Sequence, residues 1–495
     1  MSTSNTTLNC VAFDCGSSSL RTVVGTYDGT RVVTKVVSQV PNSAVNINGF
    51  YYWDLLYIFE SLKNGLREAC AQFKKIDSIG ICTWGVDFGL LDRQGFLISN
   101  PLSYRNTIGE EELSKLGDAE RRWMFDRTGI QNNRINSLYQ LSGIKRYMPE
   151  IFGIAESMLM IPDLLVYLFT GEMVSEASIA STAQMLDARS KRYVPEVLAK
   201  FGIPEQLVKP LRQHGEIIGT LKQSIADELG VVACPVVCVP SHDTACAATA
   251  VPTQEKDFIF ISSGTWSLIG TEMVDPIISK SVYDRDFANE SGVFNTITLL
   301  KNSTGMHILQ RIKKELEFNG DAYSWDDIVR MAAEYQGDEP VFDTNSSRIF
   351  NPASMIVEIK NLIGAKDVDP AQIIASAYAS LAFSYRYAIE QIQEITGIAY
   401  KSIYIVGGGS QNRYLNQLTA DFTGKVVISG PKEATSLGNI GVQLSAHLKD
   451  FDISRIRAMV RNSEIIEEFI PAGKSNLKEI DHQYLEYKDC LSQDS

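Results

Sequence analysis

The sequence predicts an α/β protein built from two domains of similar plan. A chain of 495 residues is too long for one ordinary hydrophobic core. The same order of elements occurs twice, from Leu8 and again from Phe258: an apolar strand, a turn of small polar residues and a second strand. We therefore expect a first domain over residues 1–247, a second over 248–470 and a peripheral C-terminal tail over 471–495.

The first half predicts strands over 8–14, 21–27 and 31–40, and then a helix from Leu55 that Asp54 caps. A buried strand over 78–84 follows. This order begins with a hairpin and has no GxGxxG motif, so it is not that of a dinucleotide-binding βαβ unit. The rest of this half predicts a charged helical insertion or lid over 107–150, a helix over 161–169 and a strand over 236–240.

The second half predicts strands over 258–262 and 266–270, and later strands over 402–406 and 426–429. Between these pairs lies a long helix with apolar residues at three-to-four spacing. Asp369 and Pro370 are typical of its beginning and Gly397 of its end. Asn412 is predicted to cap the next helix, and a last helix runs from Leu437.

Composition excludes some classes of partner. With 46 basic and 59 acidic side chains the net charge is −13, which argues against nucleic acid or an anionic membrane as the main partner. A nucleotide is still compatible, since backbone N–H groups can bind its phosphates. The polar N-terminus and the absence of a long apolar run predict a cytoplasmic protein without signal peptide or membrane span.

The eight cysteines form no CxxC pair, so we expect buried free thiols in a reducing compartment. Cys234, Cys238 and His242 are a less favoured metal cluster, because a fourth ligand is missing.

The segment Ser241–Thr244 carries the strongest catalytic candidate. It follows the buried strand, and ligands of α/β proteins gather at the carboxyl ends of strands. A buried ionised Asp243 is costly unless it is paired, hydrated or used. We interpret Asp243 as the base of a phosphoryl transfer and the adjacent His242 as a hydrogen-bond partner of substrate. The alternatives are a helix N-cap for Asp243, a role compatible with the first, and a satisfied core residue for His242.

Two turns are candidates for phosphate binding. In Asp14–Arg21, glycine and serine aim backbone N–H and hydroxyl donors outward, Asp14 would orient Mg²⁺ through water, and Arg21 would pair with a phosphate or a carboxylate. Ser262–Thr265 repeats the glycine and the hydroxyl donors of the first turn, without its charged residues. The alternative for each is an ordinary β-turn.

Two further segments suit a sugar or a flat ring. Gly407–Gly409 has no side chains along one wall, although a tight turn explains it equally. In Thr83–Phe88, Gly85 exposes backbone, Trp84 would stack on a sugar face, and Asp87 would accept sugar hydroxyls. A β-bulge with a core tryptophan is the alternative for that segment.

With these segments in this order, residues 8–465 resemble the FGGY carbohydrate kinases of the actin-like ATPase superfamily. The resemblance implies two actin-like (ribonuclease H-like) ATPase domains with a central cleft. The segments most similar to L-rhamnulose-specific members are Thr83–Phe88, Pro101–Arg105, Ser241–Ala245, Ser262–Leu268, Lys301–Asn302, Gln310–Arg311 and Leu437–Gly441.

By this resemblance, Asp243 removes the proton from O1 of a 6-deoxy-ketohexose, which receives the γ-phosphoryl group of ATP with Mg²⁺ present. L-rhamnulose, an intermediate of rhamnose catabolism, is the implied acceptor. L-fuculose or another ketose is the alternative, because Leu20 replaces a usual glycine while Asp14–Gly16 and Gln184–Asp187 resemble L-fuculose-specific members. Small molecules are the expected partners of a monomer or homodimer.

The implied sugar contacts are Gly85, His242, Asp243, Thr244 and Asn302, to which the residues themselves add Asp87. The implied ATP contacts are Ser17, Ser18, Ser19, Leu20, Arg21, Thr265, Gln310 and Gly408. Two other classes remain open: an actin-like ATPase that serves as a scaffold, and a degenerate kinase that senses a sugar. Ser241–Thr244 and Thr83–Phe88 argue against the scaffold, and retention of Asp14, Thr265 and Asp243 argues against the sensor.

Overall fold

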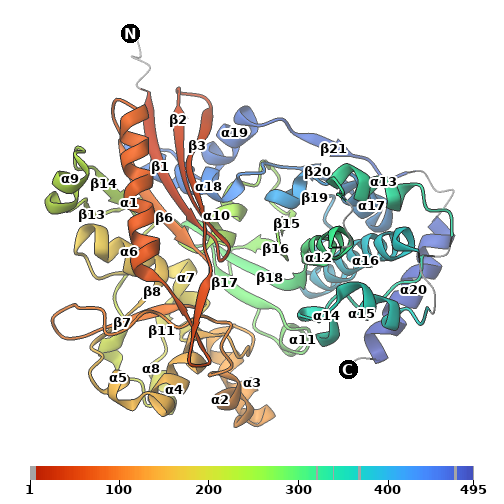
Figure 1. Cartoon of the computed structure of the whole chain (residues 1–495), viewed down its shortest axis with the longest axis horizontal. Coiled ribbons are helices and arrows are strands. Elements are labelled where there is room, and N and C mark those ends of the chain that lie inside the picture. Colours follow the sequence, from red (N-terminus) through yellow and green to blue (C-terminus); the bar gives the residue numbers. More distant parts are fainter. Residues whose placement is uncertain (1–6, 319–321, 338, 366–368, 473–476, 494–495) are drawn as a thin grey trace. The chain divides into compact units, whose positions relative to one another are not determined.

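A computed structural model describes residues 7–318, 322–337, 339–365, 369–472 and 477–493. The chain divides into two compact units, which we call unit 1 and unit 2 (Figure 1). Unit 1 comprises Met1–Gln254, Glu272–Leu299 and Glu433–Glu464. Unit 2 comprises Glu255–Thr271, Leu300–Lys432 and Ile465–Ser495. The domain boundaries expected from the sequence stay predictions.

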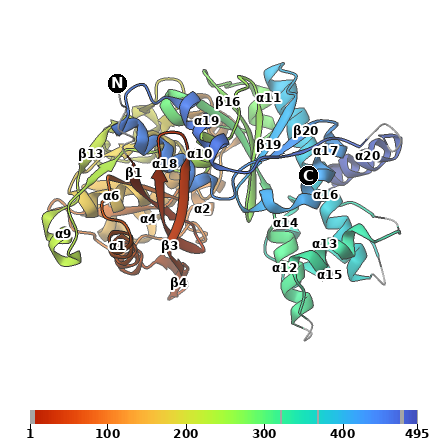
Figure 2. The same ribbon diagram turned by 90° about the horizontal axis from the view of Figure 1, so that it is seen from above.

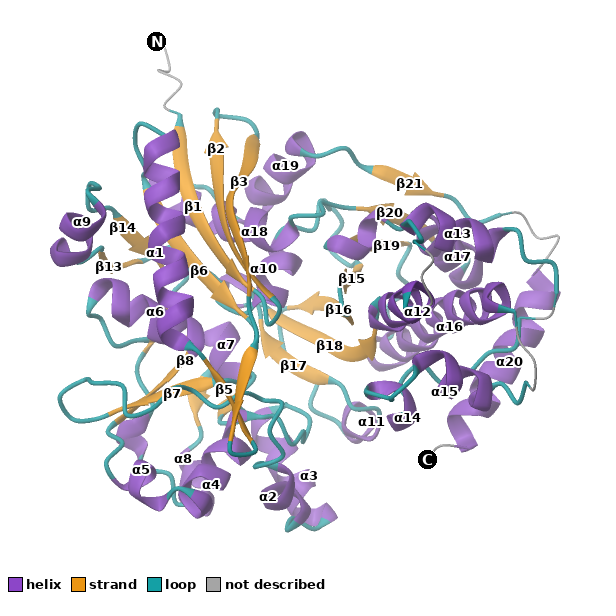
Figure 3. Ribbon diagram, in the orientation of Figure 1, coloured by secondary structure: helices purple, strands orange, loops and turns teal. Residues whose placement is uncertain are grey.

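The main sheet of unit 1 has six strands in the order β13-β14-β6-β1-β2-β3 (Figure 3). β1 pairs with β2 antiparallel and with β6 parallel, so the predicted opening hairpin is confirmed. Its central strands are buried on both faces because helices cover both. The strands of unit 1 are β1 (Leu8–Cys15), β2 (Ser19–Tyr27), β3 (Val32–Pro41), β4 (Ala44–Ile47), β5 (Phe50–Trp53), β6 (Ser78–Thr83), β7 (Phe88–Leu91), β8 (Ser157–Met160), β9 (Ser175–Glu176), β10 (Leu186–Asp187), β11 (Arg192–Tyr193), β12 (Leu211–Arg212), β13 (Ile217–Thr220), β14 (Pro235–Val237) and β17 (Ala288–Ser291).

Two helices approach opposite faces of β2 through glycines. A Cβ on Gly65 of α1 would lie 2.0 Å from the Thr22 hydroxyl, and a Cβ on Gly25 would lie 2.5 Å from Ile440 of α18. Thr22 and Gly25 are three apart in the strand, so they face opposite ways. The helices of unit 1 are α1 (Leu55–Gln72), α2 (Glu110–Ser114), α3 (Asp118–Thr128), α4 (Ser137–Tyr147), α5 (Pro149–Gly153), α6 (Ile161–Thr170), α7 (Ala177–Ser181), α8 (Pro195–Phe201), α9 (Gln223–Leu229), α10 (Asp243–Thr249), α11 (Lys280–Asp284), α18 (Ala434–His447) and α19 (Ile453–Ser463), with 3₁₀ turns η1 (Glu205–Leu207) and η2 (Val293–Asn295).

The charged segment 107–150 is largely helical, as predicted, and contributes to a second core of unit 1. Met124, Leu138 and Tyr139 are fully buried there, together with Met185 and Leu198 from later in the chain. These contacts favour an integral insertion over a lid.

The second sheet has the order β17-β18-β16-β15-β19-β20-β21, and β16 and β18 pass from one unit into the other along the chain. β15 pairs with β16 antiparallel and with β19 parallel, which repeats the plan of β1, β2 and β6. The remaining elements are β15 (Ile259–Ser263), β16 (Trp266–Met273), β18 (Ile297–Thr304), β19 (Ser402–Val406), β20 (Val426–Ser429), β21 (Glu467–Phe469), α12 (His307–Glu317), α13 (Trp325–Ala333), α14 (Ser347–Phe350), α15 (Met355–Leu362), α16 (Pro370–Thr396), α17 (Arg413–Thr423), α20 (Leu477–Gln493) and the 3₁₀ turn η3 (Gly408–Gln411).

The long helix α16 is the centre of the helical part of unit 2. Asp369 caps it by accepting from Ala371 N at 3.0 Å, and it ends at Gly397 in the left-handed conformation, as predicted. Helix α20, from the tail expected to be peripheral, lies beside α16 (Figure 2). Its Tyr484 and Tyr487 are buried and stack near Phe383, so this tail is attached through aromatic packing.

None of the helices within the described ranges has the length and apolar character that crossing a membrane requires.

Candidate active site

The β1–β2 turn holds the first group of predicted ligand contacts. Gly16 N donates to Ser19 O at 2.8 Å, and the Asn42 side chain donates to Gly16 O at 2.9 Å. These bonds fix a short turn whose Ser17 and Ser18 lie between Gly16 and the start of β2. Ser18 is exposed and Ser17 is half-buried. The turn therefore presents small polar groups on a rigid hairpin.

A charged pair lies behind this turn. Asp14 and Arg21 are direct partners across the hairpin, and Nη2 of Arg21 contacts Oδ2 of Asp14. Nη1 of Arg21 lies 2.5 Å from Oε2 of Glu433, at the start of α18. Burial raises the pKa of Asp14 despite Arg21, and the charge of Asp243 raises it further. Asp14 and Asp243 are thus close enough to repel each other.

The β6 end forms a strained turn against which the catalytic segment lies. Thr83 N donates to Ser241 O at 2.8 Å. A Cβ on Gly85 would lie 3.3 Å from Nε2 of His242, so glycine permits this close approach. Val86 has φ +67°, which is unfavourable for a β-branched residue. Val86 N donates to Thr182 Oγ1 at 3.0 Å, and this hydrogen bond helps to hold the backbone in that conformation.

Asp87 is fully buried just after this turn and binds protein groups. Its Oδ2 accepts from the indole N–H groups of Trp53 at 2.6 Å and Trp84 at 2.9 Å, and its Oδ1 accepts from Gln140 at 3.1 Å. Burial raises its pKa to about 6, although these donors act against the rise. Asp87 fixes two indole rings whose centroids are 4.3 Å apart. Its role as a direct sugar ligand stays a prediction.

Asp243 is the first residue of α10, and His242, rather than Asp243, occupies the N-cap position. The Asp243 side chain is 35% exposed, whereas that of His242 is 9% exposed. Asp243 Oδ1 accepts from Thr244 N at 2.7 Å and lies 3.4 Å from His242 Nε2. Burial raises the pKa of Asp243 even though His242 lowers it.

His242 lies between two carboxylates. Its Nδ1 is 3.0 Å from Oε2 of Glu290 on β17, and its Nε2 faces Asp243. Burial acts to lower the pKa of His242, but Glu290 and Asp243 outweigh burial and raise it to about 9. His242 is therefore a cation at neutral pH, and it offers a charged N–H donor beside the partly exposed Asp243.

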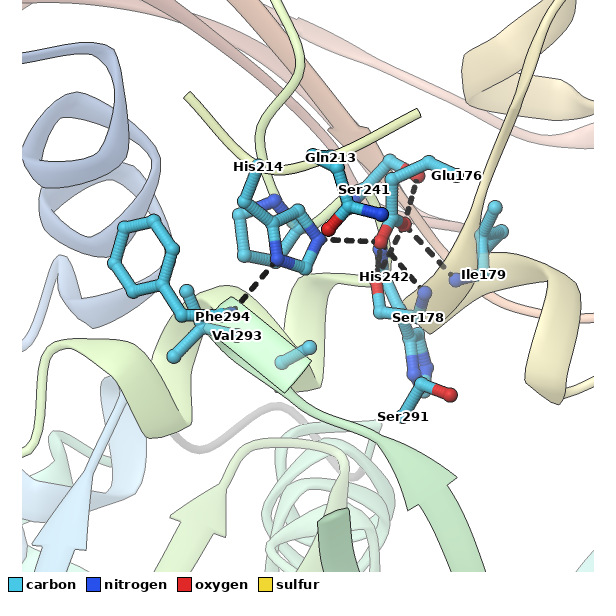
Figure 4. Close-up of polar contacts among 12 residues, drawn as sticks. Glu176, Ser178, Ile179, Gln213, His214, Ser241, His242, Ser291, Val293 and Phe294 are labelled. Carbon is cyan, nitrogen blue, oxygen red and sulfur yellow. Dashed lines mark hydrogen bonds and ion pairs between the residues drawn. The ribbon is translucent and has the colours of Figure 1, made fainter. Parts of the chain in front are cut away.

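A buried carboxylate, Glu176, holds the catalytic segment from behind (Figure 4). It accepts from Ser241 N at 2.9 Å and from Ser241 Oγ at 2.6 Å, and it lies 2.6 Å from His214 Nε2. Ser178 Oγ, which donates to Glu176, accepts from His242 N at 3.1 Å. Burial acts to raise the pKa of Glu176, but His214 and the hydrogen bonds hold it at about 2. Glu176 is an ionised anchor for the Ser241–His242 backbone.

In unit 2, the β15–β16 turn has no charged side chain. Gly264 N donates to Trp266 O at 2.8 Å, and His307 N, at the start of α12, donates to Thr265 O at 3.2 Å. Thr265 is exposed, as is Gln310 one turn along α12. Asn302 is also exposed and lies on β18, the neighbour of β16 in the sheet.

The glycine triplet packs against the same turn. A Cβ on Gly409 would lie 2.0 Å from Ser263 Oγ, and a Cβ on Gly407, where φ is +86°, would lie 2.9 Å from Ser263 O. A Cβ on Gly408 would meet no atom within 4 Å. Gly407 and Gly409 are thus required by packing, whereas Gly408 faces open space. Asn412 caps α17 by accepting from Leu415 N at 3.0 Å, as predicted.

Eleven of the predicted site residues belong to unit 1 and four belong to unit 2, and their roles stay predictions. Within the described ranges, no group of three or more His, Cys, Asp or Glu side chains is arranged to hold a metal ion. The sequence did not identify Glu176, Glu290, Glu433 or His214. The sequence signal for Glu176 is weak: it is itself an acidic residue among small and apolar neighbours. The unit 1 group is Asp14, Ser17, Ser18, Ser19, Leu20, Arg21, Gly85, Asp87, His242, Asp243 and Thr244, and the unit 2 group is Thr265, Asn302, Gln310 and Gly408.

Comparison with known proteins identifies the family of both halves of the chain. Residues 9–250 match the N-terminal domain of the FGGY family of carbohydrate kinases, and residues 259–447 match the C-terminal domain of that family. The rhamnulokinase of Bacteroides thetaiotaomicron is 33% identical over 98% of this chain and 99% of its own length. The rhamnulokinase of Oceanobacillus iheyensis is 36% identical over 92% of this chain and 96% of its own length.

Solved structures share the fold. A gluconate kinase from Lactobacillus acidophilus has a TM-score of 0.84 at 15% identity, covering 99% of this chain and 98% of its own. A ligand-bound xylulose kinase from the same organism has a TM-score of 0.83 at 15% identity, covering 98% of both chains. The predicted two-domain α/β kinase fold is therefore confirmed.

Proposed function

Because the chain belongs to the FGGY family of carbohydrate kinases, we propose that it transfers the γ-phosphoryl group of ATP to O1 of L-rhamnulose, as a rhamnulokinase. It is a phosphotransferase with a sugar acceptor, and the identity of the sugar is the proposed part. The observation that carries the proposal is the pair of Asp243 and His242: a partly exposed carboxylate of raised pKa beside a buried cation.

Asp243 is the proposed base. In the described part of the chain, the side-chain hydrogen bonds of Asp243 and its ion pair all involve Oδ1, which leaves Oδ2 for the hydroxyl of the sugar. A raised pKa brings its basicity closer to the working pH. Because phosphoryl transfer depends on positioning and charge stabilisation, an oriented carboxylate that receives the proton late is sufficient.

His242 is the proposed donor to a sugar oxygen, and Gly85 leaves the space in which that oxygen would lie. Glu290 keeps His242 charged, while Glu176 and Ser178 hold the backbone of the segment. Thr244 and Asn302 are further proposed sugar contacts. Specificity would then depend on these donors, since a site built to bind a hydroxyl rejects a sugar that lacks it.

ATP and Mg²⁺ are the proposed co-substrate and ion. Ser17, Ser18, Ser19, Leu20 and Arg21 would contact the phosphates from unit 1, and Thr265, Gln310 and Gly408 would contact the nucleotide from unit 2. The closeness of the Asp14 and Asp243 carboxyls fits a cation, which would relieve their repulsion, and Asp14 would hold it through water. When bound, Mg²⁺ supplies charge neutralisation at the transferring phosphates.

We further propose a cytoplasmic role with small-molecule partners, which is consistent with all eight cysteines being free thiols. Whether the chain is a monomer or a homodimer stays a prediction.

The test is ATP-dependent phosphorylation of L-rhamnulose, L-fuculose, L-xylulose, D-xylulose and glycerol, with kcat/KM for each. A preference of at least tenfold for L-rhamnulose supports the proposal. A preference for L-fuculose would refute the assigned sugar and keep the kinase chemistry. No turnover with any sugar, while ATP still binds, would favour a scaffold or sensor.

A further inference from the structure

A cavity lies within unit 1, and none of the predicted sugar or ATP contacts lines it. Its volume is about 450 Å³, and it is bordered by the β10–β11 turn, by β12 and by residues 274–276. Every lining residue belongs to unit 1. A volume of this size is typical of sites for small metabolites.

The lining of this cavity is strongly basic. Arg189, Lys191, Arg192 and Arg212 contribute positive charges, and Asp275 is the one acidic lining residue. Arg189 and Arg212 each reach a carboxylate only at 3.9 Å, and no ion pair of Arg192 is recorded within the described ranges. Exposed pairs this long contribute little. In a chain of net charge −13, such a concentration of weakly paired cations indicates an anionic ligand.

Lys191 lines the cavity with an unfavourable backbone conformation and a partly desolvated ammonium group. Its φ is +52°, in the left-handed region, and its Nζ donates to Thr296 O at 3.0 Å. Burial lowers its pKa to about 8, even though Glu176 acts to raise it. The lost solvation of the ammonium group would be offset by an anion that accepts from it.

The cavity also reaches the catalytic segment through one side chain. His214 lines it, and its Nε2 contacts Glu176, which binds Ser241 N and Oγ directly before His242 (Figure 4). On its other side, His214 Nδ1 accepts from Phe294 N at 2.9 Å, where φ is +46°. A ligand that displaces His214 would therefore disturb the anchor of the sugar-binding segment.

We propose that this cavity binds a small phosphorylated metabolite and that its occupation changes the affinity of the enzyme for its sugar. Guanidinium groups match the oxygens of a phosphate ester in a bidentate way, and four cationic side chains suit a dianion better than a single carboxylate. Linkage requires that, if the ligand alters sugar binding, the sugar alters binding of the ligand by the same factor.

The first test is calorimetric titration of the full chain with inorganic phosphate, 3-phosphoglycerate and glucose 6-phosphate. A non-hydrolysable ATP analogue with Mg²⁺ is kept saturating, so that the nucleotide phosphate contacts are already occupied. The variant R189Q/R192Q is compared with R67Q, which removes an exposed arginine of α1 outside the lining. We expect at least one phosphate ester to bind wild type and R67Q, and to bind R189Q/R192Q at least tenfold more weakly.

Two results would overturn the site: no binding by any of the three probes, or equal affinity in R189Q/R192Q. A second measurement does not depend on the variants. With its low pKa, Lys191 should react readily with an acetylating reagent near neutral pH, and the bound ester should protect it in a mass-spectrometric footprint. Unchanged labelling of Lys191 at a saturating ester concentration would place the ester elsewhere.

The coupling is tested by the KM of the sugar with and without the ester. A shift of at least threefold that is present in wild type and R67Q but lost in R189Q/R192Q supports coupling between the cavity and the sugar site. An unchanged KM together with protected Lys191 would refute the coupling. The coupling rests on the proposed function, because KM is measured from turnover. The test of the site itself is separable from it, because calorimetry and footprinting need no turnover.

Discussion

The hairpins β1–β2 and β15–β16 share a backbone plan and differ in charge. In the first, Asp14 lies opposite Arg21 across the ladder. In the second, at the same distance before the glycine of the turn, Ser262 lies opposite Leu268. Each hairpin runs beside a parallel strand, β6 or β19. The backbone plan thus repeats without the charges, which is consistent with the proposed role of Asp14 and Arg21 at the phosphates of ATP.

The largest expected effect comes from D243N, which tests whether the proton transfer depends on a charged side chain of unit 1. Replacing the carboxylate removes the base, so kcat should fall by about 10²–10⁴-fold. Calorimetry should show nearly unchanged sugar binding, since Asn keeps the shape of Asp243. Turnover close to wild type would remove Asp243 from the mechanism.

The next effect compares the two hairpins directly through D14N and S262A. D14N removes a charge that faces Arg21 and Asp243, so kcat should fall by roughly tenfold to a hundredfold. S262A removes a neutral hydroxyl at the matching position and should change kcat by less than about threefold. The measurement is steady-state kinetics at saturating ATP and sugar. Equal losses in the two variants would show that the hairpins are functionally alike.

The glycine triplet gives a third comparison, within unit 2. G409A places a Cβ 2.0 Å from Ser263 Oγ and should lower the free energy of unfolding by about 1–3 kcal/mol. G408A meets open space, so it should leave that free energy nearly unchanged and raise the KM for ATP severalfold. Urea denaturation and kinetics are measured on both variants. A normal KM in G408A would exclude Gly408 from the nucleotide site.

The smallest expected effect is a shift in pH dependence. Activity should rise with pH as Asp243 ionises above its ordinary range, and it should fall near pH 9 as His242 loses its proton. Removing the negative charge in E290Q should lower the pKa of His242 and move the alkaline limb of kcat/KM to lower pH. H447Q, at the end of α18, is a control that should leave this limb in place. An unmoved limb in E290Q would assign it to another group.

Sequence patterns within a few residues predicted the hairpins and helix ends, which form through contacts between near neighbours in the chain. The two hairpins, the cap and end of α16 and the Asn412 cap follow from turn residues, spacing and capping side chains within a few positions. The segments of the proposed site were inferred from the same kind of local pattern, and their roles stay predictions. The Asp243 N-cap was not confirmed, because His242 takes that position at the strand-to-helix turn.

The distant side chains that bind the site residues were not predictable from one sequence. Arg21 meets Glu433 across 412 positions, and Ser241 meets Glu176 across 65. Only folding brings such partners together, and neither acid belongs to a motif. Asp87 illustrates the same limit: its sequence context suggested a sugar ligand, while the indole groups of Trp53 and Trp84 bind its carboxylate.

Unit 1 is completed by a late part of the chain, and this has a consequence for its synthesis. Gln443 of α18 donates to Val11 O on β1 at 2.9 Å and accepts from Ser78 of β6 at 2.8 Å. A nascent chain that ends at residue 254 therefore leaves one face of the main sheet uncovered until residues 255–432 and then α18 have left the ribosome. At 5–20 residues per second this delay is roughly 10 to 40 s. Through that interval the uncovered face is a natural substrate for a chaperone.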